Sequence, residues 1–171
     1  MMRKRPVKVS NPTPEKGMTF ALNLLTFRSR TVKEVEKRLK ERGYPQEIIE
    51  EIIEKLIKLK YLDDKSYADD FIKSRTKYGT RKLKIDLRQK GIENETVQDC
   101  LEECLDAETE FSRALCEAQK ALKTMRPPYD RVVILRLRGR LARRGFSSEI
   151  ISQAIREIKL QVKSSVRQFE K

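Results

Sequence analysis

A short pattern occurs three times in this chain, at intervals of about fifty residues. Each copy has a leucine, two spacer residues, a cation, a glycine and a large apolar residue, and the glycines are Gly43, Gly91 and Gly145. Apolar residues also recur at fixed distances on both sides of each glycine. The pattern predicts one helical unit used three times, and such arrays are usually binding surfaces rather than catalytic pockets.

Apolar spacing and capping residues predict three helices in each repeat. No segment alternates at a period of two residues over a useful length, so we expect an all-α fold with nine helices. The expected organisation is a flexible basic tail (1–17), three repeats (18–62, 63–105 and 106–162) and a basic C-terminal tail (163–171).

Single residues at the helix ends sharpen this expectation. Thr31 is an expected N-cap, and Glu34 completes a capping box with it. Thr80 and Ser147 are expected to cap later helices in the same way. Gly79 is expected to end a helix, and the three pattern glycines are expected at helix C-termini with positive φ.

Composition indicates a reduced, cytoplasmic protein with thin helical cores. The chain has 171 residues, 38% charged and 38% hydrophobic, with only six Gly and six Pro. No apolar run approaches the roughly 20 residues that span a bilayer, and no apolar signal core follows the N-terminal cations. Three cysteines without framework spacing fit free thiols, and we expect a monomer.

The net charge of +13 is unevenly spread. Residues 71–90 carry eight cations and one acid, whereas residues 93–110 carry eight acids and no cation. From Arg131 to Arg144 there are six Arg and no acid that could neutralise them. Helical spacing places Lys77, Arg81, Lys84 and Arg88 on one face, and Arg136, Arg140, Arg143 and Arg144 on another.

These cations are the candidate residues for binding a partner or DNA. The full set is Arg75, Lys77, Arg81, Lys82, Lys84, Arg88, Arg136, Arg138, Arg140, Arg143 and Arg144. Clustered Lys and Arg attract polyanions, and an all-Arg face favours bidentate recognition of phosphate or carboxylate. The alternative is a pair of ordinary solvated helix faces. No aromatic residues interleave with the cations, which argues against stacking of single-stranded bases.

Catalytic and metal-binding chemistry is poorly supported. The chain has no His, the commonest general base and zinc ligand. Cys100 and Cys104 align with apolar positions of the other repeats and are expected to pack in the core. Asp63 and Asp64 could hold Mg²⁺ for phosphoryl transfer, but their helical flanks favour N-capping. We therefore expect no catalytic residue, metal or cofactor.

The chain resembles the RecX family, bacterial regulators of the RecA recombinase, over about residues 20–158. The strongest part of the resemblance is Tyr61-Leu62-Asp63-Asp64, Tyr67-Ala68, Arg75, Tyr78-Gly79, Arg81-Lys82-Leu83, Leu87 and Lys90-Gly91-Ile92. The first repeat contributes a further set: Ala21, Leu24-Leu25, Arg28, Arg30, Glu34, Leu39 and Gly43-Tyr44. The third repeat matches less well, and Thr80 stands where many members have proline.

The resemblance implies three three-helix repeats in an elongated, curved molecule. It also implies binding in the groove of the RecA–DNA filament and restraint of recombinase, ATPase and coprotease activity in DNA repair, recombination and the SOS response. Sequence-independent binding to single- or double-stranded DNA is a further implied property. Two rival hypotheses remain: a protein that only competes for DNA, and an enzyme acting on nucleic acid through Asp63 and Asp64.

Overall fold

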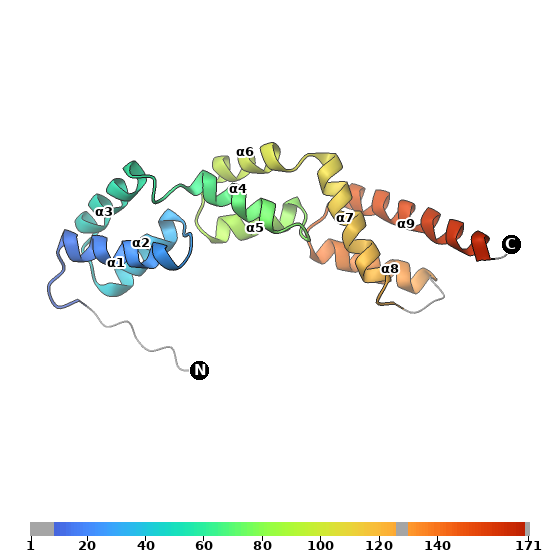
Figure 1. The fold of residues 1–171 in the computed structure, drawn as a ribbon, viewed down its shortest axis with the longest axis horizontal. Helices are drawn as coiled ribbons and strands as arrows, with labels where there is room; N and C mark the ends of the chain where they lie inside the picture. The colour runs from blue at the N-terminus through green and yellow to red at the C-terminus, as the bar shows by residue number, and fades with distance from the viewer. Residues whose placement is uncertain (1–8, 126–129, 170–171) are drawn as a thin grey trace. The chain divides into compact units, whose positions relative to one another are not determined.

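The computed structural model describes residues 9–125 and 130–169, with side chains as far as Val162. Within these residues the backbone forms nine α-helices and no β-strand, which confirms the all-α class (Figure 1). The helices are α1 (Pro14–Phe27), α2 (Val32–Arg42), α3 (Gln46–Lys58), α4 (Asp64–Ser74), α5 (Thr80–Gln89), α6 (Asn94–Cys104), α7 (Ala107–Leu122), α8 (Arg131–Arg143) and α9 (Ser148–Phe169).

Both ends of the helical region differ from the expected tails. Helix α1 begins at Pro14, inside the segment expected to be flexible, because Thr13 caps it and accepts from the Lys16 N–H at 3.4 Å. Proline also suits the first helical turn, where its missing N–H has no partner to lose. Helix α9 continues to Phe169, through most of the expected C-terminal tail. Residues 1–8 and 170–171 lie outside the described part of the chain.

The pattern glycines confirm the repeat. Gly43, Gly91 and Gly145 follow α2, α5 and α8, with φ of 89°, 86° and 83°. The expectations for Gly79 and Thr80 were wrong. Helix α4 ends at Ser74, so Gly79 is not its terminus, and Thr80 is the first residue of α5 rather than its cap. Five residues, 75–79, thus connect α4 to α5 in a loop, which a continuous helical pattern did not reveal.

The chain divides into two compact units, and the middle repeat is shared between them. The first unit consists of Met1–Ala68 and Leu87–Val97, of which residues from 9 onward are described. Its core lies among α1, α2 and α3, where Val35, Leu39 and Leu56 are fully buried. These positions are one helical face of α2 and α3, so burial follows the apolar spacing.

The second unit consists of the described residues of Asp69–Asp86 and Gln98–Lys171. Helices α7, α8 and α9 enclose its main core, which includes Leu137, Leu141 and Phe146. Alanines of α7 are buried there as well, and their small side chains let the helices approach closely. The core of this unit also encloses one charged residue of α7, Glu117, which is only 6% exposed.

The two cysteines of α6 were both expected in the core, and one of them is fully buried. Cys100 is fully buried, which confirms its core position. Cys104 is half-buried, and its thiol donates a hydrogen bond to the Asp69 carboxylate at 3.4 Å. Burial, followed by the hydrogen bond and charge of Asp69, raises the pKa of the Cys104 thiol. Among the described residues no group of acids and cysteines could hold a metal ion.

Candidate functional site

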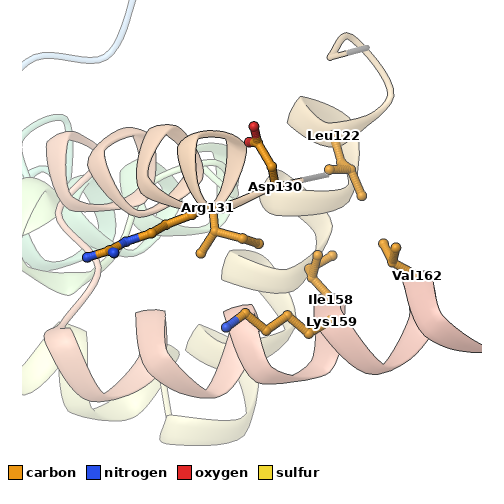
Figure 2. Close-up of a pocket in the computed structure, with 7 residues that line it drawn as sticks. Leu122, Asp130, Arg131, Ile158, Lys159 and Val162 are labelled. Atoms are coloured by element: carbon orange, nitrogen blue, oxygen red, sulfur yellow. The ribbon is translucent and has the colours of Figure 1, made fainter. Parts of the chain in front are cut away.

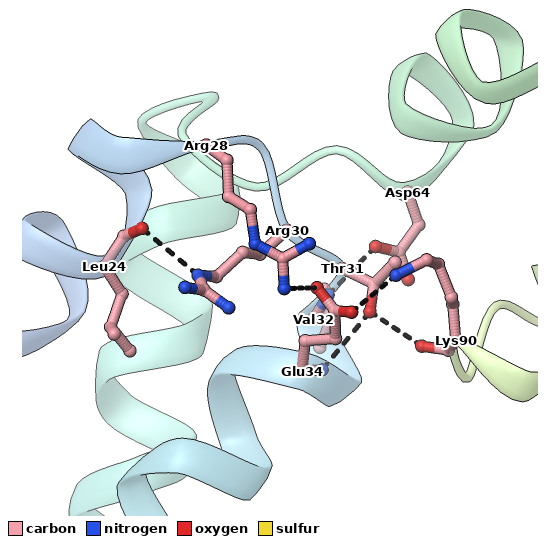
Figure 3. A network of polar contacts seen from close by, with 8 residues as sticks. All are labelled: Leu24, Arg28, Arg30, Thr31, Val32, Glu34, Asp64 and Lys90. Carbon is pink, nitrogen blue, oxygen red and sulfur yellow. Dashed lines mark hydrogen bonds and ion pairs between the residues drawn. The ribbon is translucent and has the colours of Figure 1, made fainter. Parts of the chain in front are cut away.

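The first two repeats meet at the N-terminus of α2, which we call the first junction (Figure 3). The Thr31 hydroxyl is buried and donates to the Lys90 carbonyl at 2.7 Å. The same oxygen accepts from the Glu34 N–H at 3.2 Å, which confirms Thr31 as the N-cap. The Val32 N–H donates to the Asp64 carboxylate at 2.9 Å. The free N–H groups of α2 are therefore partly satisfied from the second repeat.

Glu34 was expected to close a capping box with Thr31, but its carboxylate binds cations instead. It accepts from the Lys90 ammonium at 2.6 Å and lies 3.8 Å from the Arg28 guanidinium. Burial opposes ionisation of Glu34, but Lys90, Arg28 and Arg30 outweigh it and lower the carboxyl pKa. Burial lowers the pKa of Lys90, but its hydrogen bonds to Glu34 and Tyr67 outweigh burial, so the pKa is raised overall. The pair thus holds the two repeats together electrostatically.

The Tyr61-Leu62-Asp63-Asp64 string is largely structural. Asp63 caps α4 by accepting from the Ser66 N–H at 3.0 Å, and Leu62 is buried. Asp64 caps a helix of the preceding repeat instead of its own. Burial and the nearby carboxylates raise the pKa of Asp64, although the hydrogen bond from Val32 opposes them. Tyr61, by contrast, is 58% exposed.

The second and third repeats meet in the second unit through a similar set of contacts, which we call the second junction. The Gly79 N–H donates to the Arg144 carbonyl at 3.0 Å, as the Thr31 hydroxyl donates to the residue before Gly91. The Thr80 N–H donates to the Glu110 carboxylate at 2.9 Å, as Val32 donates to Asp64. The N-termini of α2 and α5 are therefore each capped in part by the following repeat.

Close backbone contact explains two of the glycines. A Cβ on Gly79 would lie 2.6 Å from the Cα of Phe146. A Cβ on Gly145 would clash with the backbone nitrogen of Lys82, and the backbone φ there is positive. In this chain Gly79 lies at a close crossing of two backbone segments and does not end a helix. Tyr67 and Ala68 are also motif residues of α4, and Ala68 is fully buried.

Two of the four arginines expected on the third-repeat face are neutralised. Arg140 Nε lies 2.8 Å from one carboxylate oxygen of Glu117, and Arg144 Nη1 lies 3.0 Å from the other. Arg144 also donates to the Lys77 carbonyl at 3.3 Å and stacks over the Tyr78 ring. The expectation that no acid neutralises this face was wrong, because the acid comes from α7. Reversing Arg140 and Arg144 would therefore break the fold of this unit rather than test docking.

The remaining candidate cations fall into two classes. Lys82 pairs with Asp86 at 2.6 Å, and Lys84 donates to Gln98 at 2.6 Å, so both are engaged locally. Lys77 lies in the loop before α5 rather than on its face. Within the described residues the following are exposed and form no ion pair: Arg75, Lys77, Arg81, Arg88, Arg136, Arg138 and Arg143. Arg75 stacks over the Phe71 ring at 4.1 Å.

A pocket of about 450 Å³ lies in the second unit near the start of α8 (Figure 2). Four apolar residues line it: Leu122, Ile134, Ile158 and Val162. Three charged residues, Asp130, Arg131 and Lys159, complete the lining. The Asp130 carboxylate caps α8 by accepting from the Val132 and Val133 N–H groups. This pocket suits an apolar group, so it is not part of the cationic surface.

Sequence models of one family match all three repeats. They are described as the first, second and third three-helix domains of RecX, and they match residues 18–56, 63–101 and 108–155. The chain belongs to the RecX family. The three RecX domains coincide with α1–α3, α4–α6 and α7–α9, so the internal pattern and the family division agree.

Curated and solved RecX proteins agree with this assignment. A protein of Mycolicibacterium smegmatis called "Regulatory protein RecX" is 34% identical over 143 residues, covering 80% of this chain and 76% of the relative. Its namesake from Prosthecochloris aestuarii is 31% identical and covers 88% of this chain and 98% of the relative. The crystal structure of RecX from Lactobacillus salivarius superimposes with a TM-score of 0.77 at 31% identity, covering 86% and 97%.

Sequence reasoning missed two features that the structure reveals. Glu117 carries no local signal, because its partners are separated from it by 23 residues or more. Leu59 and Tyr61 are both well exposed, on either side of Lys60, whose φ is 60°. A left-handed Lys is uncommon, and it turns the chain sharply after α3.

None of the helices is long and apolar enough to cross a bilayer, as judged from the described residues.

Proposed function

We propose that this chain binds the filament that RecA forms on DNA and restrains its recombinase, ATPase and coprotease activities. Membership of the RecX family and the printed name of its relatives, "Regulatory protein RecX", support a regulatory role. The use of Asp63 and Asp64 as helix caps supports a regulator without a catalytic site. We further propose that it acts as a cytoplasmic monomer, with no metal or cofactor.

The exposed arginines of α5 and α8 carry this proposal. Arg81 and Arg88 lie about two turns apart on one side of α5, and Arg136 and Arg143 do so on α8. All four are exposed, and none forms an ion pair within the described residues. A guanidinium without an internal carboxylate is available for bidentate bonds to phosphate or carboxylate.

The net charge strengthens the same conclusion. A charge of +13 creates a field that attracts a nucleoprotein filament and speeds encounter. Changing the two pairs should leave the fold intact, since their side chains lie outside the buried clusters. Arg81, Arg88, Arg136 and Arg143 are therefore better sites for testing docking than Arg140 and Arg144, which pair with the buried Glu117.

The test is charge reversal. The double variant Arg136→Glu/Arg143→Glu should weaken inhibition of DNA-dependent RecA ATPase by about tenfold or more, which corresponds to lost charged hydrogen bonds. The matched control is Lys37→Glu/Lys40→Glu, which changes the net charge equally at two exposed residues of α2. Equal inhibition by the parent and the α8 variant would show that these arginines do not bind the filament. Equal weakening by the α8 variant and the α2 control would show that only the net charge of the protein matters.

A second function is favoured by the same arginines: sequence-independent DNA binding that affects recombination only by competition. Phosphate contacts of this kind lose affinity steeply as salt rises. Competition predicts that inhibition disappears when DNA is in large excess over the protein. A filament-bound regulator keeps inhibiting under that condition, because RecA-coated DNA is its target.

A further inference from the structure

A second pocket of the second unit, of about 270 Å³, lies beside α7 and the loop before α5. Cations and hydroxyls line it, including Lys77, Arg113, Lys120, Thr76 and Ser112. Ammonium, guanidinium and hydroxyl groups together are the donors that phosphate oxygens accept from. Apart from Lys77, none of these residues is among the candidate cations expected from the sequence.

Arg113 is the unusual member. Its Nη1 is buried and has no hydrogen-bond partner within the described residues. Burial is the largest influence on this guanidinium and lowers its pKa, while Cys104 and Glu110 oppose the shift. The Glu110 carboxylate is already engaged by the Thr80 N–H. A poorly solvated cation without a bound anion is costly, so an anion entering the pocket would relieve it.

Among the described residues, the one acid that lines the pocket does not repel an anion. Glu117 is held by Arg140 through one carboxylate oxygen and by Arg144 through the other. Two cations therefore neutralise one carboxylate, and the surrounding field stays positive. Lys77 and Lys120 are exposed and can move toward a ligand.

We infer that this pocket binds a phosphate of a nucleic-acid backbone. Its volume lies below the range of about 300–1,000 Å³ that encloses drug-sized ligands, so it suits a phosphodiester group rather than a whole nucleotide. The inference rests on the proposed function, which supplies DNA as the polyanion. The pocket would add one defined phosphate contact to the exposed arginines of α5 and α8 that the proposed function rests on.

The first experiment measures binding of a single-stranded oligonucleotide at several salt concentrations. Loss of the one phosphate contact should lower the slope of log K against log[salt] by about 0.7 in Lys77→Gln/Lys120→Gln. The control is Lys73→Gln/Lys123→Gln, which removes two exposed lysines of the same unit that do not line the pocket. Equal slopes for the two variants would overturn the inference.

The second experiment uses Cys116 as a reporter. It is an exposed thiol that lines the pocket, whereas Cys100 is buried and burial raises the pKa of Cys104. Modification of Cys116 by an aromatic disulfide is followed by peptide mass spectrometry. An oligonucleotide at ten times its Kd should slow the reaction about tenfold. Inorganic phosphate should protect at higher concentration, and poly-glutamate should not.

The outcomes separate the pocket from the proposed function. Oligonucleotide protection that is lost in Lys77→Gln/Lys120→Gln supports the pocket. Protection by poly-glutamate but not by the oligonucleotide would overturn it in favour of an acidic protein partner. If the parent restrains RecA filaments while DNA leaves Cys116 fully reactive, only the pocket fails. If the parent binds neither DNA nor filaments, the proposed function fails as well.

Discussion

The two junctions use equivalent acceptors but different donors. At the first junction a threonine hydroxyl donates to the carbonyl before Gly91, and at the second the Gly79 N–H donates to the carbonyl before Gly145. A carboxylate of the following repeat then accepts the next N–H, from Asp64 in one case and Glu110 in the other. The repeat therefore preserves a way of capping a helix rather than a particular residue.

The difference lies in how each junction uses charge. At the first, Glu34 binds Lys90, which closes the contact with one ion pair and a nearby Arg28. At the second, the backbones approach so closely that only glycine fits, and a buried Glu117 holds two arginines beside the contact. The first junction depends on side-chain hydrogen bonds, and the second depends on close packing and a buried charge.

Gly145 should be the most sensitive position. Gly145→Ala combines a positive φ with a Cβ placed against the Lys82 backbone, and should cost about 3 kcal/mol of unfolding free energy. Gly91→Ala is also strained, at a positive φ and with its Cβ against Cβ and Cγ of Lys33, but it should cost less because these are side-chain atoms rather than backbone atoms. Denaturant unfolding measures both, and Gly139→Ala, in the interior of α8, is the control that should not destabilise. Equal costs at Gly145 and Gly91 would remove the distinction between the junctions.

Removal of the buried charge of Glu117 should have the second-largest effect on stability. Glu117→Gln leaves Arg140 and Arg144 without a carboxylate, and should cost about 2 kcal/mol, since the arginines are 39% and 22% exposed and partly solvated. Glu34→Gln at the first junction should cost about 1 kcal/mol. Thermal unfolding at matched salt compares them. A larger loss for Glu34→Gln would contradict the assignment of the buried charge to the second junction.

Thr31 tests the hydrogen bonds of the first junction. Thr31→Val keeps the shape but removes both bonds of the buried hydroxyl, and should cost about 1.5 kcal/mol. Thr31→Ser keeps the hydroxyl and should recover most of that loss. If valine and serine behave alike in chemical unfolding, packing rather than hydrogen bonding holds the first junction too.

Asp64 should show the smallest effect and a distinctive pH dependence. Its pKa is raised in the folded chain, so its ionised form is disfavoured there and its contribution to stability is lost as pH rises through the folded value. Asp64→Asn still accepts from Val32, and should change stability at neutral pH by less than about 1 kcal/mol. The stability of the parent relative to Asp64→Asn should therefore fall from pH 3 to pH 7. A rise would show that the ionised cap dominates.

Local signals predicted much of this structure. Helical spacing and the glycines gave the three repeats, and Thr31, Asp63 and Ser147 cap helices as their positions indicated. These features depend on residues within one turn of each other, which a single sequence records directly.

Long-range pairing was not predictable in the same way. The Asp64 bond to Val32 spans 32 residues, and the Arg140 bond to Glu117 spans 23. An arginine-rich helix looks unneutralised when only its own acids are counted. Of the four arginines expected on the third-repeat face, Arg140 and Arg144 pair with Glu117, and Arg136 and Arg143 form no ion pair within the described residues.

The most direct test of the account is to measure affinity for RecA filaments, free RecA and bare DNA at matched low and physiological salt. A regulator that docks on the filament should bind filaments more tightly than bare DNA, and should retain part of that affinity as salt rises, because protein contacts add to phosphate contacts. Equal affinity for filaments and bare DNA, with the same steep salt dependence, would contradict the proposal and leave a protein that only competes for DNA.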